Sequence, residues 1–221
     1  MAIVVYFVPG WMACDRDHGA EIQKIKCLWS NQRVDVEVLK WDSDCDWFSA
    51  RENTDAAAAQ LVHNICNRIR KRNCNPSDVF LCAHSLGVEV ALKALAQMPF
   101  QVVQAFLLAG AVDANNKNLI RRAVGNVKHG VINVHSDLDL MLRIFNHIEN
   151  CVPLGQAAHP LMRNLERQVF IDVSQMCELL FQILGLMCIN DVGWENIRNI
   201  LATTRFHGSE IYLDALLLGL N

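Results

Sequence analysis

The chain has 221 residues, which fits one domain built around a single hydrophobic core. Hydrophobic residues make up 52% of it, and the formal net charge is −3 at pH 7. No basic stripe indicates a nucleic-acid partner, and no run of like charges indicates a solvated tail.

Nine cysteines are scattered through apolar segments, and no two of them have the C-x-x-C spacing of a zinc or dithiol motif. An odd number of dispersed cysteines indicates reduced thiols, which favours a reducing compartment such as the cytoplasm. The N-terminal residues lack the charged flank of a signal peptide. The most apolar stretch, Cys177 to Ile189, is too short to span a bilayer, so no transmembrane segment is expected.

Short β-rich runs alternate with helical patterns along the chain. Strands are predicted at Ile3 to Val8, Val34 to Trp41, Val79 to Ala83, Val102 to Leu108, Val131 to His135 and Gln168 to Val173. Helices are predicted near Ala20 to Asn31, Ala56 to Arg72, Leu86 to Gln97, Asn116 to Val124 and Leu138 to His147, and again after the sixth strand. Loops are predicted at Asp42 to Asp55 and Cys151 to Pro160.

This alternation predicts an α/β fold, a doubly wound parallel sheet with helices on both faces. The expected strand order is 2-1-3-4-5-6, with residues 1–221 forming one domain. Ligands bind beyond the carboxyl ends of the strands in such sheets, so the residues after each strand are the candidates for a site.

After the third strand comes Ala83-His84-Ser85-Leu86-Gly87, followed directly by a helix. A serine on a sharp strand-to-helix turn projects its hydroxyl clear of the sheet. The segment resembles the nucleophile elbow of the α/β-hydrolase superfamily, G-x-S-x-G, and its His-Ser-Leu-Gly part is typical of lipase- and esterase-like members. Ala83 replaces the first glycine and is small enough for that position. The resemblance implies an α/β-hydrolase fold with Ser85 as nucleophile.

Two backbone N–H groups are expected to form the oxyanion hole. One belongs to Leu86, at the start of the helix after the serine. The family's second donor comes from the loop after an early strand, and here the first strand ends in Pro9-Gly10-Trp11-Met12, which resembles the H-G-x element of many hydrolases. Gly10 lets the backbone approach a substrate closely, so the N–H of Trp11, or else that of Met12, is the candidate.

In this superfamily the triad acid follows the serine and precedes the histidine. Asp139 and Asp137 follow the fifth strand, and Asp113 follows the fourth. The family most often places its acid after the strand that corresponds to the fifth one here, which favours Asp139 and leaves Asp137 and Asp113 as alternatives. An aspartate that is not the acid is expected to cap a helix.

The histidine comes last in the family order, and after the predicted sixth strand only His207 remains. Gly208 beside it gives the backbone freedom, and Ser209 can cap the last helix. His84 is expected to point away from the nucleophile, and His135 is expected to be structural. The apolar segment Met176 to Ile189 lies before His207, and we expect residues 174–202 to form either a small helical lid or a core helix.

The sequence therefore predicts a serine hydrolase that cleaves a carboxylester or thioester through an acyl-enzyme, with Ser85, Asp139 and His207 as its triad. The substrate is expected to be a small or lipid-like ester, and no metal or organic cofactor is needed. Two alternatives stay open: a hydrolase-like scaffold that binds a ligand without turnover, and an acyltransferase that uses the same triad.

Overall fold

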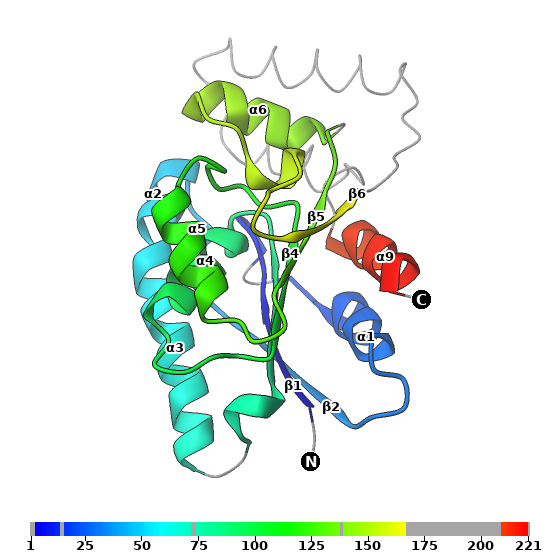
Figure 1. Ribbon diagram of the computed structural model, residues 1–221. Coiled ribbons are helices and arrows are strands. Elements are labelled where there is room, and N and C mark those ends of the chain that lie inside the picture. Colours follow the sequence, from blue (N-terminus) through cyan, green and yellow to red (C-terminus); the bar gives the residue numbers. More distant parts are fainter. Residues whose placement is uncertain (1–2, 14–15, 72–73, 138, 167–208, 221) are drawn as a thin grey trace.

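Six parallel strands form one sheet in the order β2-β1-β3-β4-β5-β6, as the sequence predicted. The computed structural model describes residues 3–13, 16–71, 74–137, 139–166 and 209–220 (Figure 1). The strands are β1 (Ile3–Val8), β2 (Val34–Val38), β3 (Val79–His84), β4 (Gln104–Leu108), β5 (Val131–His135) and β6 (Arg163–Glu166).

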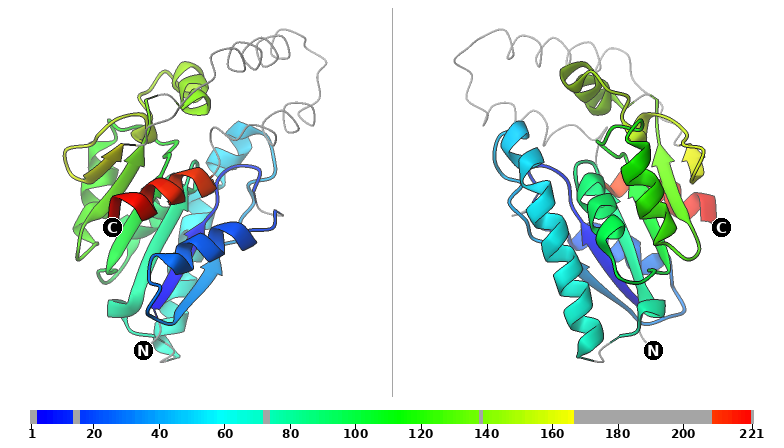
Figure 2. Two further views of the ribbon diagram at one scale, coloured as in Figure 1. Left: turned by 90° about the vertical axis from the view of Figure 1, so that its right-hand side faces the viewer. Right: turned by 60° about the vertical axis from the view of Figure 1, so that its left-hand side comes forward.

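Helices cover both faces of this sheet (Figure 2). The α-helices of the described residues are α1 (Gly19–Cys27), α2 (Trp47–Glu52), α3 (Thr54–Arg70), α4 (Gly87–Gln97), α5 (Lys117–Gly125), α6 (Leu140–Glu149) and α9 (Ser209–Leu220), with short 3-10 turns at Pro76–Asp78 and Leu154–Gln156. The face covered by α3, α4 and α5 is opposite the face covered by α1 and α9 (Figures 1 and 2). Among the described residues, no helix has both the length and the hydropathy to cross a bilayer.

The central strands are apolar along their whole length because both of their faces are covered. Every residue of β1 and β3 is buried, whereas β2, at the edge, is largely half-exposed and alternates valine with acidic residues. The strand order reverses between β1 and β3, which lie side by side in parallel. A crevice forms at such a switch point beyond the strand ends, and both the Pro9-Gly10-Trp11 loop and Ser85 follow these two strands.

One strand was not predicted, and one predicted loop contains a helix. The strand that pairs with β5 is Arg163–Glu166. The predicted strand Gln168 to Val173 lies outside the described residues. The short polar strand β6 lies at the sheet edge, where partly exposed positions do not require an apolar run. The predicted loop at Asp42 to Asp55 contains α2, which begins after Asp46 because the Asp46 carboxylate accepts the backbone N–H groups of Phe48 and Ser49.

Gly87 is required by the close approach of α4 to the end of β1. A Cβ at this position would lie 2.3 Å from the carbonyl oxygen of Val8 and 2.5 Å from that of Pro9. Both atoms belong to the backbone, so neither can move aside as a flexible side chain would. We therefore expect Gly87→Ala to lower the free energy of unfolding by roughly 3 kcal/mol or more, measured by urea denaturation. Gly125→Ala is the matched control, because a Cβ there meets nothing within 4 Å; an equal loss in both variants would contradict the steric argument.

Candidate active site

Ser85 occupies a strained turn between β3 and α4. Its φ of 53° lies in the left-handed region, which costs a residue other than glycine about 1 kcal/mol or more. The neighbouring strand end holds it there: the Ser85 N–H donates to the Leu108 carbonyl at 3.0 Å, and the Ser85 carbonyl accepts the N–H of Ala111 at 3.1 Å. This is the geometry expected of a nucleophile elbow.

The loop after β1 passes directly over the serine. A Cβ at Gly10 would lie 2.7 Å from Ser85 Cβ and 3.3 Å from Ser85 Oγ, so only glycine lets the backbone come this close. Leu86, the other expected donor, is buried at the N-cap of α4. Of the two residues considered for the first donor, Met12 directs its N–H to the Ser43 carbonyl at 3.1 Å, which leaves Trp11 as the candidate.

The side chain of Trp11 anchors this loop to α2 and α6. Its indole N–H donates to the Cys45 carbonyl at 2.7 Å, and its ring meets those of Trp47 and Phe145 edge-on at 5.6 and 6.3 Å. Trp47 and Phe145 stack on each other at 4.1 Å. This aromatic cluster was not predicted; the sequence signal for it is Asp46, a capping residue directly before Trp47 in the predicted loop.

Asp139 is the buried member of the three candidate acids, with 1% of its surface exposed. It lies between β5 and α6, where its Oδ1 accepts the backbone N–H of Leu142 at 3.0 Å as the N-cap of α6. Its Oδ2 accepts the hydroxyl of Tyr212 from α9. The candidate acid therefore also caps a helix, two roles that the sequence analysis had assigned to different aspartates.

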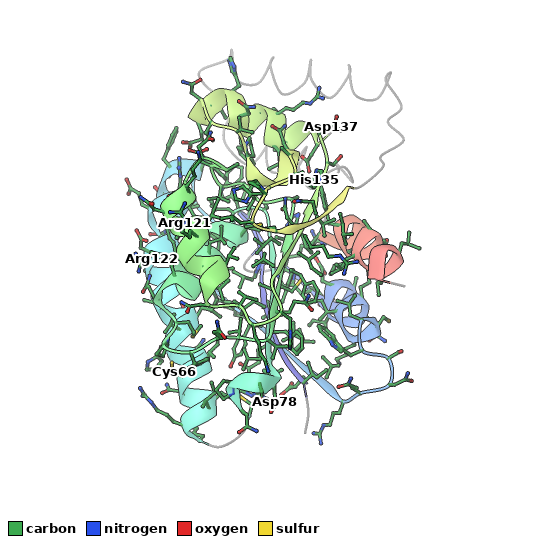
Figure 3. The ribbon with its side chains drawn as sticks, in the orientation of Figure 1. Cys66, Asp78, Arg121, Arg122, His135 and Asp137 are labelled. Carbon is green, nitrogen blue, oxygen red and sulfur yellow. The ribbon has the colours of Figure 1, made fainter. Side chains whose placement is uncertain are left out.

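The two alternative acids have other surroundings. Asp137 is exposed near the start of α6, and its backbone carbonyl accepts Nε of Arg143 at 2.9 Å (Figure 3). Asp113 is half-exposed, and its Oδ1 accepts the N–H of Asn115 at 2.9 Å in a local turn. His207 lies outside the described residues, as does the predicted lid at 174–202. His84 and His135, at the ends of β3 and β5, are both buried.

No family model matches the sequence, and no curated protein matches it closely enough to count as a relative. Solved structures are similar to it. The crystal structure of esterase PE8 aligns with a TM-score of 0.50 at 14% identity, over 81% of this chain and 90% of that one. The chain has the α/β-hydrolase fold. The Francisella virulence factor BioJ gives 0.47 at 14% identity over 99% and 76%, and Arabidopsis thaliana SOBER1 gives 0.42 at 13% over 80% and 96%.

Within this α/β-hydrolase fold, α9 is tied to α1 by a buried carboxylate that the sequence analysis did not single out. Glu21 is 1% exposed, and its Oε1 accepts the Ser209 hydroxyl at 2.8 Å and the Arg16 guanidinium at 3.1 Å. His18 Nδ1 lies 3.6 Å from the same oxygen. Ser209 is thus the first residue of α9 and directs its hydroxyl to another helix.

The surroundings of Glu21 favour its ionised form. Burial raises the pKa of Glu21, but the neighbouring His18 ring, the hydrogen bond from Ser209 and the charge of Arg16 outweigh it, and the pKa falls from 4.5 to about 2. A carboxylate with a depressed pKa in the folded state stabilises the fold above its unfolded pKa, and this stabilisation is lost as the pH falls through the folded pKa. The stabilisation is therefore complete above about pH 5 and declines between pH 4.5 and 2.

We accordingly expect Glu21→Gln to lower the free energy of unfolding at pH 7 by up to about 3 kcal/mol, which corresponds to the pKa difference. The gap between the variant and the natural protein should narrow as the pH falls below 4.5, as measured by urea denaturation from pH 7 to pH 3. Glu210→Gln is the control, because Glu210 is half-exposed and shares Arg16 at 3.5 Å. A gap that stays constant with pH would show that the carboxylate charge is not responsible.

Proposed function

We propose that the protein is a serine hydrolase that cleaves a carboxylester or thioester through an acyl-enzyme intermediate. The observation that carries this proposal is Ser85 in the left-handed turn after β3, with the Gly10 backbone against its hydroxyl at the switch point of the sheet. A strained serine beside N–H donors is an arrangement suited to acyl transfer. The esterase with the same fold is consistent with this chemistry.

In the proposed reaction, His207 removes the proton of Ser85 as its oxygen attacks the carbonyl carbon. The N–H groups of Trp11 and Leu86 stabilise the oxyanion of the tetrahedral intermediate. His207 then protonates the leaving alcohol or thiol, and later removes a proton from the water that hydrolyses the acyl-enzyme. Asp139 orients the His207 ring and stabilises its positive charge. These steps require no metal and no organic cofactor.

A fluorophosphonate probe tests the proposal directly, because it reacts with serines that a base has activated. We expect one probe per chain, and peptide mass mapping should place it on Ser85. Ser43→Ala is the matched control and should take up the probe as the natural protein does. Ser43 is fully buried, and its side chain forms no hydrogen bond among the described residues. A folded protein that takes up no probe would favour the binding scaffold instead. Labelling of Ser85 without ester hydrolysis would point to an acyltransferase, which a screen of alcohol and amine acceptors would then identify.

We further propose that the substrate carries an apolar acyl group. The basis is the apolar sequence of Met176 to Ile189. The rings of Trp11, Trp47 and Phe145, which cluster at the loop after β1, also support it. Each buried CH₂ contributes about 0.8 kcal/mol, so kcat/KM for p-nitrophenyl esters should rise about fourfold per carbon from acetyl to octanoyl. A kcat/KM that is flat or falls along this series would argue against an apolar acyl site.

We place the enzyme in a reducing compartment such as the cytoplasm. The cysteines of the described residues are free thiols, and burial raises the pKa of the Cys82 thiol, which disfavours its reactive thiolate form. A fractionation experiment with an antibody against the protein tests this location.

A further inference from the structure

The C-terminal helix α9 brings a buried hydroxyl to the candidate acid. Tyr212 is fully buried, and its hydroxyl donates to Oδ2 of Asp139, 73 positions away in the sequence. The helix lies on the face of the sheet opposite α4, beside α1 (Figure 2). The hydroxyl of a buried tyrosine usually finds a hydrogen-bond partner, and here that partner is the carboxylate.

We propose that Tyr212 is a positioning residue that fixes the carboxylate of Asp139 for its interaction with His207. This proposal rests on the function proposed above. Oδ1 of Asp139 is committed to the N–H of Leu142 and Oδ2 to Tyr212, so the plane of the carboxylate is fixed from both sides. A carboxylate has about four lone-pair sites, so it can accept donors in addition to these two, such as an imidazole N–H. The bonds to Leu142 and Tyr212 then determine the direction from which such an imidazole must approach.

The position of Tyr212 is itself held by contacts between α9 and α1. The Ser209 hydroxyl donates to Glu21 at 2.8 Å, and Lys24 of α1 pairs with Asp214 of α9 at 2.7 Å. These contacts lie on both sides of Tyr212 in the sequence. His207 precedes Ser209 by two residues, so the helix that holds the acid also begins beside the proposed base.

Tyr212 is also expected to affect how strongly Asp139 and His207 hold a proton. A hydroxyl that donates to a carboxylate stabilises its anionic form and so lowers its affinity for a proton. Without this bond, Asp139 would hold the His207 proton more strongly, and the acid limb of the pH profile would move to higher pH. Among the described residues, His84, whose ring lies 6.3 Å from that of Tyr212, and His135, four residues before Asp139, also belong to this part of the fold. Both are unchanged in the variants below.

The chain offers a matched control, because Tyr6 and Tyr212 are its two tyrosines. Tyr6 in β1 is 1% exposed, and its hydroxyl has no hydrogen-bond partner among the described residues. We would measure kcat and KM for p-nitrophenyl butyrate from pH 5 to pH 9 in the natural enzyme, Tyr212→Phe and Tyr6→Phe. Tyr212→Phe should lower kcat about tenfold with KM nearly unchanged and shift the acid limb upward by about half a pH unit. Tyr6→Phe should stay within about twofold of the natural enzyme.

Two further measurements separate positioning from packing. In an Asp139→Asn background, adding Tyr212→Phe should cost no more than about twofold, because the carboxylate through which it acts is gone. In Tyr6→Phe, Tyr212 is the remaining tyrosine, and its replacement by 3-fluorotyrosine strengthens the donor. The acid limb should then move to lower pH, opposite to the effect of Tyr212→Phe. This measurement retains the hydroxyl and so does not depend on whether Tyr212→Phe folds.

An unchanged kcat and pH profile in folded Tyr212→Phe would overturn the proposal, as would a tenfold loss that persists in the Asp139→Asn background. The proposal would also be overturned if 3-fluorotyrosine in place of Tyr212 left the acid limb of the pH profile unchanged. Failure of the proposed function looks different: the natural enzyme itself would neither hydrolyse the ester nor take up the fluorophosphonate probe on Ser85, and the role of Tyr212 would fall with it.

Discussion

Ser85→Ala is expected to lower kcat for ester hydrolysis by on the order of a millionfold while the protein stays folded. The variant removes the attacking oxygen and leaves the backbone of the turn in place. Ala111 and Leu108 hold that turn through main-chain hydrogen bonds, which do not involve the lost hydroxyl. The measurement is kcat for p-nitrophenyl butyrate, with urea denaturation as the test of folding.

Ser43→Ala serves as the control for the loss of a buried serine hydroxyl near the site. Ser43 contributes its carbonyl to the Met12 N–H and keeps that contact in the variant, so its activity should be close to that of the natural protein. If folded Ser85→Ala turned over ester at a near-normal rate, the nucleophile assignment and the proposed mechanism would both be wrong.

Asp139→Asn is expected to lower kcat about ten-thousandfold, the scale seen when the acid of a serine triad loses its charge. The change is close to isosteric, and asparagine caps a helix as well as aspartate does, so α6 should retain its N-cap. Tyr212 can also still bond to the amide. The loss should therefore appear in kcat and not in stability, which urea denaturation measures in parallel.

Asp137→Asn and Asp113→Asn are the comparisons. The first changes an exposed side chain, and the second weakens one bond in the turn at Asn115, so each should change kcat by no more than about threefold. A larger loss from either of them than from Asp139→Asn would transfer the acid to that residue. A crystal structure with His207 bonded to Asp113 or Asp137 would do the same.

Local sequence determined much of the fold. The apolar runs of β1 and β3 and the helical patterns between the strands predicted the doubly wound sheet and its order, because central parallel strands must be apolar throughout. The small residues around Ser85 predicted a tight turn, and Gly87 meets the backbone of β1 as that turn requires. These features depend on periodicity and on the size of single side chains, which a sequence shows directly.

Tertiary structure decided which polar groups meet. Three aspartates followed strands β4 and β5 in the sequence, and a family resemblance favoured Asp139, but its burial and its bond to Tyr212 of α9 arise only from packing. The bonds of Tyr212 to Asp139 and of Ser209 to Glu21 join residues 73 and 188 positions apart. No local pattern encodes such pairs, because they form where two elements pack together. The strand β6 was not predicted for a related reason: its pairing with β5, and not its own hydrophobicity, makes it a strand.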